Sequence, residues 1–337
     1  MSNSTVAKHD EDLKKAIYTP AEVAQFGRQG IDDYKKNAAR GMGIGIAGIQ
    51  DYFAPLMPGQ ICAIIGQTSH YKSGLMHHIE HQAAGDLAEQ GRTDEILIHV
   101  SVEECIEEQA YMEFARYSGE DPGAIARGNV QDWGKLESAV TRVAGIPIFR
   151  IGDSLARAEF EPHLYMSNMI RSIRHLVEGD VLDWKPKVAG LFFDYLQAFP
   201  IDPEIAKSTS RDNQRRLQVR SDFYRLRKAS KYFKCPVWVA VQAKQKLDGA
   251  HPPIMLPGVY DGEETSSIGQ RADRVLTTWM PARTNLVGAY IDLGKDSFTV
   301  DNDMLWIKVA KQRGGYPAGK AWRCRVDFSH NFISPEK

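Results

Sequence analysis

The chain has 337 residues and a formal net charge of −1, with 42 Lys and Arg against 43 Asp and Glu. Apolar residues make up 43% and charged residues 25%, which excludes a disordered chain, a collagen-like repeat and a coiled-coil rod. The balanced charge argues against a protein coated with nucleic acid, although a ring could still confine a basic surface to its bore.

The cysteines are too few and too widely spaced for a disulfide scaffold or a zinc site, at positions Cys62, Cys105, Cys235 and Cys324. This usage predicts a reducing, cytoplasmic location. The polar N-terminus carries no signal-peptide pattern, and no apolar run is long enough for a bilayer, so we expect no membrane association.

A helix start is encoded at Thr19-Pro20-Ala21-Glu22, where Thr19 can cap, Pro20 suits the first helical position and Glu22 completes a capping box. The helix should run to about Asn37 and end at the glycine-spaced residues 39–48. The prediction is a flexible arm and linker helix over residues 1–45, followed by one domain over residues 46–337.

Short apolar strands then alternate with helical segments, which predicts a mostly parallel α/β sheet with helices on both faces. The later strands leave little room for helices and predict an antiparallel extension of the sheet. The predicted strands are Ile61–Ile65, Glu95–Ser101, Ile146–Ile151, Ala189–Asp194, Val237–Gln242, Arg274–Trp279, Ala289–Leu293, Leu305–Ala310 and Arg323–Phe328.

The first strand leads into a loop that matches the Walker A pattern G-x-x-x-x-G-K-[ST] with one departure, Tyr71 at the second glycine position. Lys72 would neutralise the β- and γ-phosphates of ATP, and the Ser73 hydroxyl would ligate Mg²⁺. A Cβ at position 71 strains the loop or changes its shape. The expected nucleotide-binding residues are Gly66, Gln67, Thr68, Ser69, His70, Tyr71, Lys72, Ser73 and Gly74.

Three further strand ends carry the side chains that a nucleotide hydrolase needs. Asp194 ends an apolar strand in the Walker B manner and would hold Mg²⁺, Glu103 could polarise an attacking water, and Gln242 could sense the γ-phosphate. These residues could instead have structural roles; Asp194, for example, could simply cap a turn at the end of its strand. Ligands of open α/β sheets bind at the carboxyl ends of the strands, so the joint pattern favours an NTPase.

Three histidines on the following helix, His77, His78 and His81, are candidates for metal ligands. They lack the HExxH order and an obvious third ligand, so the pattern favours solvated or core histidines.

Several stretches resemble the C-terminal ATPase domain of DnaB-type replicative helicases, which has a RecA-like fold. The resemblance runs from about residue 40 to the end of the chain, and its more specific signatures are Asp194-Tyr195-Leu196-Gln197 and Lys311-Gln312-Arg313. It is carried by GIAGIQDYFAPLMPGQICAIIG (45–66), HVSVEECIEEQ (99–109), LFFDYLQAF (191–199), RLRKASKYFKCPVWVAVQ (225–242), SSIGQRADRVL (266–276) and VAKQRGGYPAG (309–319).

The resemblance implies that Glu103 is the catalytic base of an ATP-driven helicase and that Gln242 couples the γ-phosphate to DNA-binding loops. It also implies that Lys311 and Arg313 reach a neighbouring subunit's nucleotide, Arg313 as an arginine finger, so that the enzyme works as a ring, a hexamer in the family's manner. Spacing alone favours a solvated basic strand end for Lys311 and Arg313.

Two features depart from the family's pattern. Members carry an N-terminal helical domain that helps organise the ring and contacts primase; only some 45 residues stand in its place here, so we expect that role to be absent or supplied by another protein, such as a loader or a separate primase. The linker helix could still promote a ring. Glu263 occupies a position where the family commonly presents an arginine to DNA.

Single-stranded DNA would be bound by basic residues near the strand ends, through phosphate contacts with little sequence preference. The first choice is the loop 202–212 with Lys207 and Arg211, and the second is the loop with Lys244 and Lys246. Two alternatives stay open: a RecA-like ATPase that does not unwind DNA, of recombinase or clock type, and a nucleotide-binding structural or adaptor protein whose phosphate loop has decayed at Tyr71.

Overall fold

The computed structural model describes residues 18–36, 41–157, 164–179, 181–208, 211–244, 256–263, 267–284, 286–292 and 296–336. The chain divides into two units, residues 1–41 and 42–337. The first contains helix α2 (Pro20–Lys36). Its start has the predicted capping box, because the backbone N–H of Thr19 donates to Glu22 (2.7 Å) and that of Glu22 donates to the Thr19 hydroxyl (3.3 Å).

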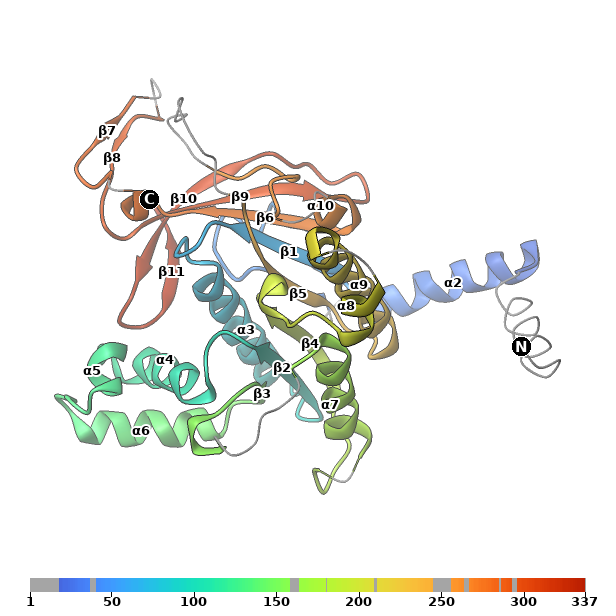
Figure 1. Cartoon of the computed structure of the whole chain (residues 1–337), viewed down its shortest axis with the longest axis horizontal. Coiled ribbons are helices and arrows are strands. Elements are labelled where there is room, and N and C mark those ends of the chain that lie inside the picture. The colour runs from blue at the N-terminus through green and yellow to red at the C-terminus, as the bar shows by residue number, and fades with distance from the viewer. Residues whose placement is uncertain are drawn as a thin grey trace. The chain divides into compact units, whose positions relative to one another are not determined.

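The second unit is built on a sheet whose nine described strands follow the order β11-β10-β9-β6-β1-β5-β4-β2-β3 (Figure 1). A separate two-stranded sheet pairs β7 with β8. The strands are β1 (Ile61–Gly66), β2 (Glu95–Ser101), β3 (Ile148–Ile151), β4 (Lys187–Asp194), β5 (Val237–Gln242), β6 (Arg274–Trp279), β7 (Tyr290–Ile291), β8 (Phe298–Thr299), β9 (Met304–Gln312), β10 (Ala321–Asp327) and β11 (Phe332–Pro335).

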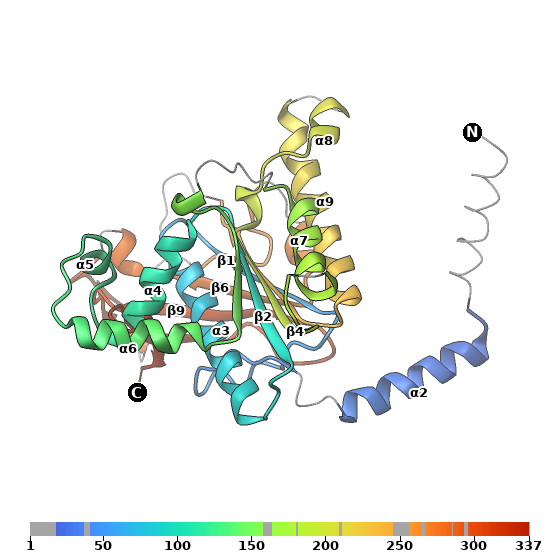
Figure 2. The same cartoon turned by 90° about the horizontal axis from the view of Figure 1, so that it is seen from below.

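Helices cover both faces of this sheet, with α3 on one face and α7 and α9 on the other (Figure 2). The helices are α3 (Lys72–Glu89), α4 (Ile106–Ser118), α5 (Pro122–Ala126), α6 (Trp133–Ala144), α7 (Met166–Glu178), α8 (Pro203–Ser208), α9 (Arg211–Tyr232) and α10 (Ser267–Arg271), with short 3₁₀ turns at Leu155–Arg157, Leu196–Ala198 and Pro281–Thr284. None of the described helices is both long and apolar enough to cross a membrane.

The alternation of side chains along β1 shows how the two layers form. Cys62 and Ile64 pack toward α3, whereas Ile61, Ala63 and Ile65 pack toward α7 and α9. All are buried, because a central parallel strand is covered on both faces, and this is why the strand reads as a continuous apolar run.

The predicted fold class is confirmed. Strands β3, β2, β4, β5, β1 and β6 are parallel, and β9, β10 and β11 extend the sheet in antiparallel pairing. The sequence pattern does not predict β8 or β11: β8 has two residues, and β11 is an edge strand that ends in Pro335, a residue normally read as a strand breaker.

The prediction of a loop over residues 202–212 is wrong. Residues 203–208 form α8, and α9 begins at Arg211. Asp202 precedes Pro203, and the Asp202 carbonyl accepts the first helical hydrogen bond, from Ala206 (3.0 Å). This is the sequence signature of a helix start, with Pro at the first helical position.

Candidate nucleotide-binding site

The loop between β1 and α3 places the Lys72 ammonium at the carboxyl edge of the sheet. Its Nζ donates to the Gln67 carbonyl (2.8 Å) and to Gln242 Oε1 (3.2 Å). Burial lowers the pKa of Lys72, while the charges of Asp194 and Glu103 act in the opposite direction. Lys72 is therefore held in the loop, with no carboxylate bound directly to it among the described residues, in a position to bind an anion.

Tyr71 takes the left-handed conformation that glycine usually provides, with φ 62° and ψ 31°. The cost of this backbone is offset by side-chain contacts: the hydroxyl donates to Asn331 Oδ1 (2.5 Å), and the ring meets Phe328 edge to face. The ring lies over Gly74, where a Cβ would come within 2.4 Å of it. The departure from the Walker A pattern is thus accommodated by the glycine that follows Lys72-Ser73.

We expect Gly74→Ala to lower the free energy of unfolding by about 1–3 kcal/mol, because the new methyl group would displace the Tyr71 ring. Urea unfolding followed by circular dichroism measures the change. Gly85→Ala is the matched control, since Gly85 lies in the same helix and has open space at its Cβ position. The double variant Tyr71→Gly/Gly74→Ala should cost less than the sum of the two single changes. Equal stability of Gly74→Ala and Gly85→Ala would contradict this account of the loop.

The ends of β2 and β4 bring two carboxylates to the same edge. Ser101 and Asp194 are register partners, and the Ser101 hydroxyl accepts from the backbone N–H of Glu104 (3.2 Å), which turns the chain after β2. Burial raises the pKa of Glu103, and the charge of Asp194 raises it further while Lys72 opposes the shift. A carboxylate with a raised pKa beside a phosphate-binding loop is suited to accept a proton from water.

Asp194 fits a role as a ligand of Mg²⁺. Its side chain is buried, and its Oδ1 has no hydrogen-bond partner among the described residues. An unpaired buried carboxylate oxygen is costly unless a cation or water satisfies it. Ser73 lies in the wall of the same cavity, so one carboxylate and one hydroxyl oxygen are available to a hard cation.

Gln242, at the end of β5, connects the phosphate loop to residues 256–263, called here the Glu263 segment. Its Nε2 donates to the Thr68 hydroxyl (2.8 Å), and its backbone carbonyl accepts from the N–H of Glu263 (2.7 Å). Gln197 reinforces this connection, since its amide donates to the carbonyls of Gln242 (3.2 Å) and Glu263 (3.3 Å). Sequence reasoning missed Gln197 as a coupling residue, although it falls within the Asp194–Gln197 signature.

These side chains line one cavity of about 760 Å³. Of the predicted site residues it contains Thr68, Ser69, Tyr71, Lys72, Ser73, Gly74, Glu103, Asp194 and Gln242. Residues that the sequence analysis did not assign to the nucleotide complete the wall, namely His77, Glu104, Glu108, Tyr111, Met112, Pro122, Gly123, Ala126, Tyr195 and Arg283. Arg283 brings a second cation to the cavity, from the turn after β6.

Three residues predicted to bind the nucleotide do not line the cavity. Gly66 ends β1, where a Cβ would meet the Thr278 hydroxyl at 2.4 Å, so glycine is needed for packing. Gln67 contributes its carbonyl to Lys72. His70 is buried, and its Nδ1 accepts from the backbone N–H of Met280 (3.0 Å); burial, with the charges of Lys72 and Arg283, lowers its pKa to about 4.

Lys311 and Arg313 also lie outside the cavity, at the C-terminal end of α10. Lys311 Nζ donates to the carbonyls of Gly269, Gln270 and Ala272 (2.7–2.9 Å). Arg313 donates to the Gln270 carbonyl (2.6 Å) and lies 3.5 Å from Asp273, and its side chain is 50% exposed. Within one chain, Arg313 therefore does not contact the cavity that Lys72 lines.

The candidate DNA-binding residues are only partly described. Lys207 is exposed near the end of α8, and Lys244 is exposed just after β5. Lys244 is fixed to the Glu263 segment, because its backbone N–H donates to the Asp261 carbonyl (2.8 Å). The side chain of Arg211 and all of Lys246 lie outside the described residues.

The chain is similar in structure to a DnaB-like replicative helicase studied together with its interactions with primase, with a TM-score of 0.68 and 16% identity over 95% of this chain and 68% of that one. It is also similar to a second solved structure, an ATPase domain, with a TM-score of 0.65 and 15% identity over 92% and 98% of the two chains. At this identity the likeness establishes the shared RecA-like fold. No family model and no curated protein matches the sequence.

Proposed function

We propose that the chain is an ATP-hydrolysing DNA helicase or translocase that assembles as a hexameric ring around single-stranded DNA. The observation that carries the proposal is the convergence of Lys72, Glu103, Asp194 and Gln242 on one cavity, at the carboxyl ends of four neighbouring strands. The fold that holds them is shared with a DnaB-like replicative helicase and with a second solved ATPase domain.

Hydrolysis would proceed by in-line attack of a water on the γ-phosphate. Glu103 orients this water and accepts its proton, while Lys72 stabilises the charge that develops on the phosphate oxygens. Ser73 and Asp194 would hold Mg²⁺, which supplies further charge neutralisation when it is bound. Gln242 reports the state of the γ-phosphate, since it bonds the phosphate loop through its side chain and the Glu263 segment through its backbone.

Lys311 and Arg313 act on the nucleotide of a neighbouring subunit in this proposal. Two observations support this role. Neither residue lines the cavity of its own chain, and the Arg313 side chain is half exposed, so its guanidinium is available to a neighbouring subunit. A finger supplied in trans makes each site complete only at a subunit interface, which is why the enzyme would work as a ring.

Single-stranded DNA would pass along the segments that carry Lys207, Arg211, Lys244 and Lys246. Lys244 is hydrogen-bonded to Asp261, and Glu263 in the same segment is hydrogen-bonded to Gln242, so a change at the γ-phosphate would reach Lys244 through a continuous network. A loader or a primase would be a further partner, and primase appears with the DnaB-like helicase to which the fold is similar. We place the protein in the cytoplasm, in keeping with its four unpaired cysteines.

The test is ATP hydrolysis with and without a single-stranded oligonucleotide, followed by strand displacement from a forked duplex. We expect DNA to accelerate hydrolysis, and Lys72→Ala to reduce it by about a hundredfold or more. Lys135→Ala is the control, because Lys135 is exposed on α6, away from the cavity. Hydrolysis without DNA binding would overturn the helicase proposal and favour a ring that does not unwind. Unchanged hydrolysis in Lys72→Ala would overturn the assignment of the ATPase site.

A further inference from the structure

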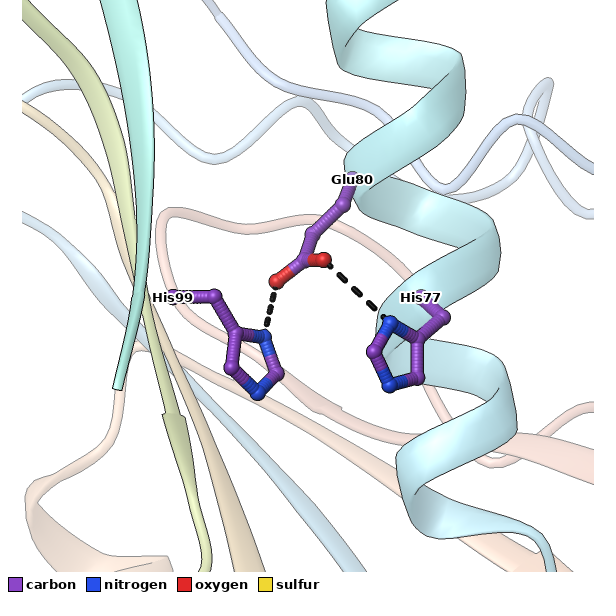
Figure 3. A group of neighbouring side chains, drawn as sticks. All are labelled: His77, Glu80 and His99. Carbon is purple, nitrogen blue, oxygen red and sulfur yellow. Dashed lines mark hydrogen bonds and ion pairs between the residues drawn. The ribbon is translucent and has the colours of Figure 1, made fainter. Parts of the chain in front are cut away.

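A polar cluster lies in the interior between α3 and β2 (Figure 3). It consists of His77 and Glu80 on α3 and His99 on β2, each at most 2% exposed. One ligand atom from each lies within 4.8 Å of the other two. The sequence favours solvated or core positions for the histidines of α3, and His77, His78 and His81 are indeed buried; it does not anticipate the residues that join them, Glu80 and His99.

The imidazole rings of His77 and His99 are arranged around the Glu80 carboxylate. They stack in parallel, with centroids 5.1 Å apart and an angle of 10° between the planes. His99 Nδ1 is hydrogen-bonded to Glu80 Oε1, and His77 Nδ1 lies 3.5 Å from Glu80 Oε2. Because an ionised carboxylate only accepts, this arrangement places the ring proton of His99 on Nδ1. The Nδ1 atom of His77 faces Glu80 but makes no hydrogen bond among the described residues.

The Nε2 atom of His99 is then a lone-pair donor without a ligand, and Nε2 of His77 also has no partner among the described residues. Both atoms are buried. They point away from Glu80 and to the same side of the cluster (Figure 3). Two buried ring nitrogens are costly to leave unsatisfied, so this geometry calls for a proton, a water or a metal ion.

The surrounding charges favour a cation. Glu80 and Glu113 share one guanidinium, that of Arg150, which lies 3.0 Å from Glu80 and is also bonded to Glu113. Glu113 also pairs with His81 (2.5 Å), so the cluster carries a net negative charge when its histidines are neutral, the form in which they can bind a metal.

The cluster adjoins the candidate nucleotide cavity, because His77 forms part of the cavity wall, although both of its ring nitrogens are buried. Water from the cavity side could fill the coordination positions that two nitrogens leave open.

The geometry points to a second metal site, in which His77 Nε2 and His99 Nε2 bind a divalent transition ion of the Zn²⁺ class, with water in the remaining positions. Glu80 faces the Nδ1 atoms of both rings and is hydrogen-bonded to that of His99, as carboxylates commonly are behind metal-binding histidines. Imidazole nitrogens select Zn²⁺, Co²⁺ or Ni²⁺ over Mg²⁺, which prefers oxygen. This site is therefore distinct in chemistry from the oxygen ligands of Ser73 and Asp194.

The experiment uses the full chain, stripped with a chelator and titrated with Co²⁺ in excess Mg²⁺ and without nucleotide. We expect one Co²⁺ per chain, with the visible absorption of a low-coordinate, nitrogen-bound ion, and displacement of that ion by Zn²⁺. His77→Gln and His99→Gln should abolish this absorption. Glu80→Gln should weaken binding by about 10–100-fold. His78→Gln is the matched control: it is a buried histidine on the same helix, bonded to the Gly45 carbonyl and the Ile333 N–H, outside the cluster.

A zinc-edge X-ray absorption spectrum of the wild-type chain provides a readout that needs no variant, and imidazole scattering from the bound ion is the expected result. Absence of stoichiometric Co²⁺ binding, equal binding in the His77 and His99 variants, or a spectrum without imidazole would each overturn the site. Since no step of this experiment uses ATP, its failure would leave the proposed hydrolysis untouched, and failure of hydrolysis would leave the metal site untouched.

Discussion

Replacing Glu103 with glutamine is expected to lower kcat for ATP hydrolysis by about 10²–10⁴-fold while ATP affinity is retained, because the amide cannot accept the proton of the attacking water. Steady-state hydrolysis and equilibrium binding of a fluorescent ATP analogue separate the two effects. Glu89→Gln is the control, since Glu89 is an exposed glutamate at the end of α3. A variant with normal kcat would remove Glu103 from the mechanism and leave another group of the cavity as the base.

Glu103 also determines how kcat is expected to depend on pH. Burial raises the pKa of Glu103 above its ordinary value of 4.5, with a further contribution from the Asp194 charge. A general base works in its ionised form, so activity should be lost as the pH falls through this raised pKa. The acid limb of the kcat profile should therefore lie above the range of an ordinary glutamate. A limb at or below an ordinary glutamate's pKa of 4.5, measured where the protein stays folded, would contradict the assignment.

Arg313→Ala is expected to reduce kcat by about 10³-fold or more, the usual contribution of an arginine finger. The fold should tolerate the change, because Asp273, which Arg313 approaches at 3.5 Å, also pairs with Arg227 (2.5 Å). Arg171→Ala serves as the control, as an exposed arginine on α7. Thermal unfolding of both variants checks that the loss of activity is not a loss of structure.

Mixing two inactive variants distinguishes a finger in trans from one in cis. An Arg313→Ala subunit keeps Lys72, and a Lys72→Ala subunit keeps Arg313, so a mixed ring contains interfaces at which both groups are intact. Hydrolysis should therefore reappear on mixing and depend on the ratio of the two variants. If the arginine acted within its own chain, or not at all, the mixture would be as inactive as its components.

Much of the site could be predicted because its residues stand at the ends of strands. Lys72, Glu103, Asp194 and Gln242 each follow a short apolar run, and parallel strands bring their carboxyl ends to one edge, so their proximity follows from topology. Arg283 escaped prediction because its turn follows β6, where the sequence carries no motif. Its place in the cavity depends on β6 pairing with β1.

In the phosphate loop, too, one feature could be predicted from the sequence and another depended on the tertiary structure. The sequence indicates that Tyr71 departs from the expected glycine, but the means of accommodating it comes from residues far along the chain. Asn331 and Phe328 hold the tyrosine side chain, and they reach it only because the antiparallel extension returns the chain to α3.

The sequence predicts a helix after the phosphate loop, and in the structure most residues of this helix, α3, are buried. The sheet, the segment 42–56 and α4 all contact α3. Its buried polar side chains are therefore paired with other polar groups in the interior. Glu80 meets His99 and Arg150 there, residues 19 and 70 positions away in sequence.

The sequence by itself determined the class of fold, most of the strands of the large sheet and the four strand-end groups at the candidate nucleotide cavity, because strand periodicity and strand-end chemistry are local properties. Only the tertiary structure decided which polar residues share the interior. Burial makes the partners of Glu80, His77 and Tyr71 obligatory, and burial is set by packing between distant segments rather than by local pattern.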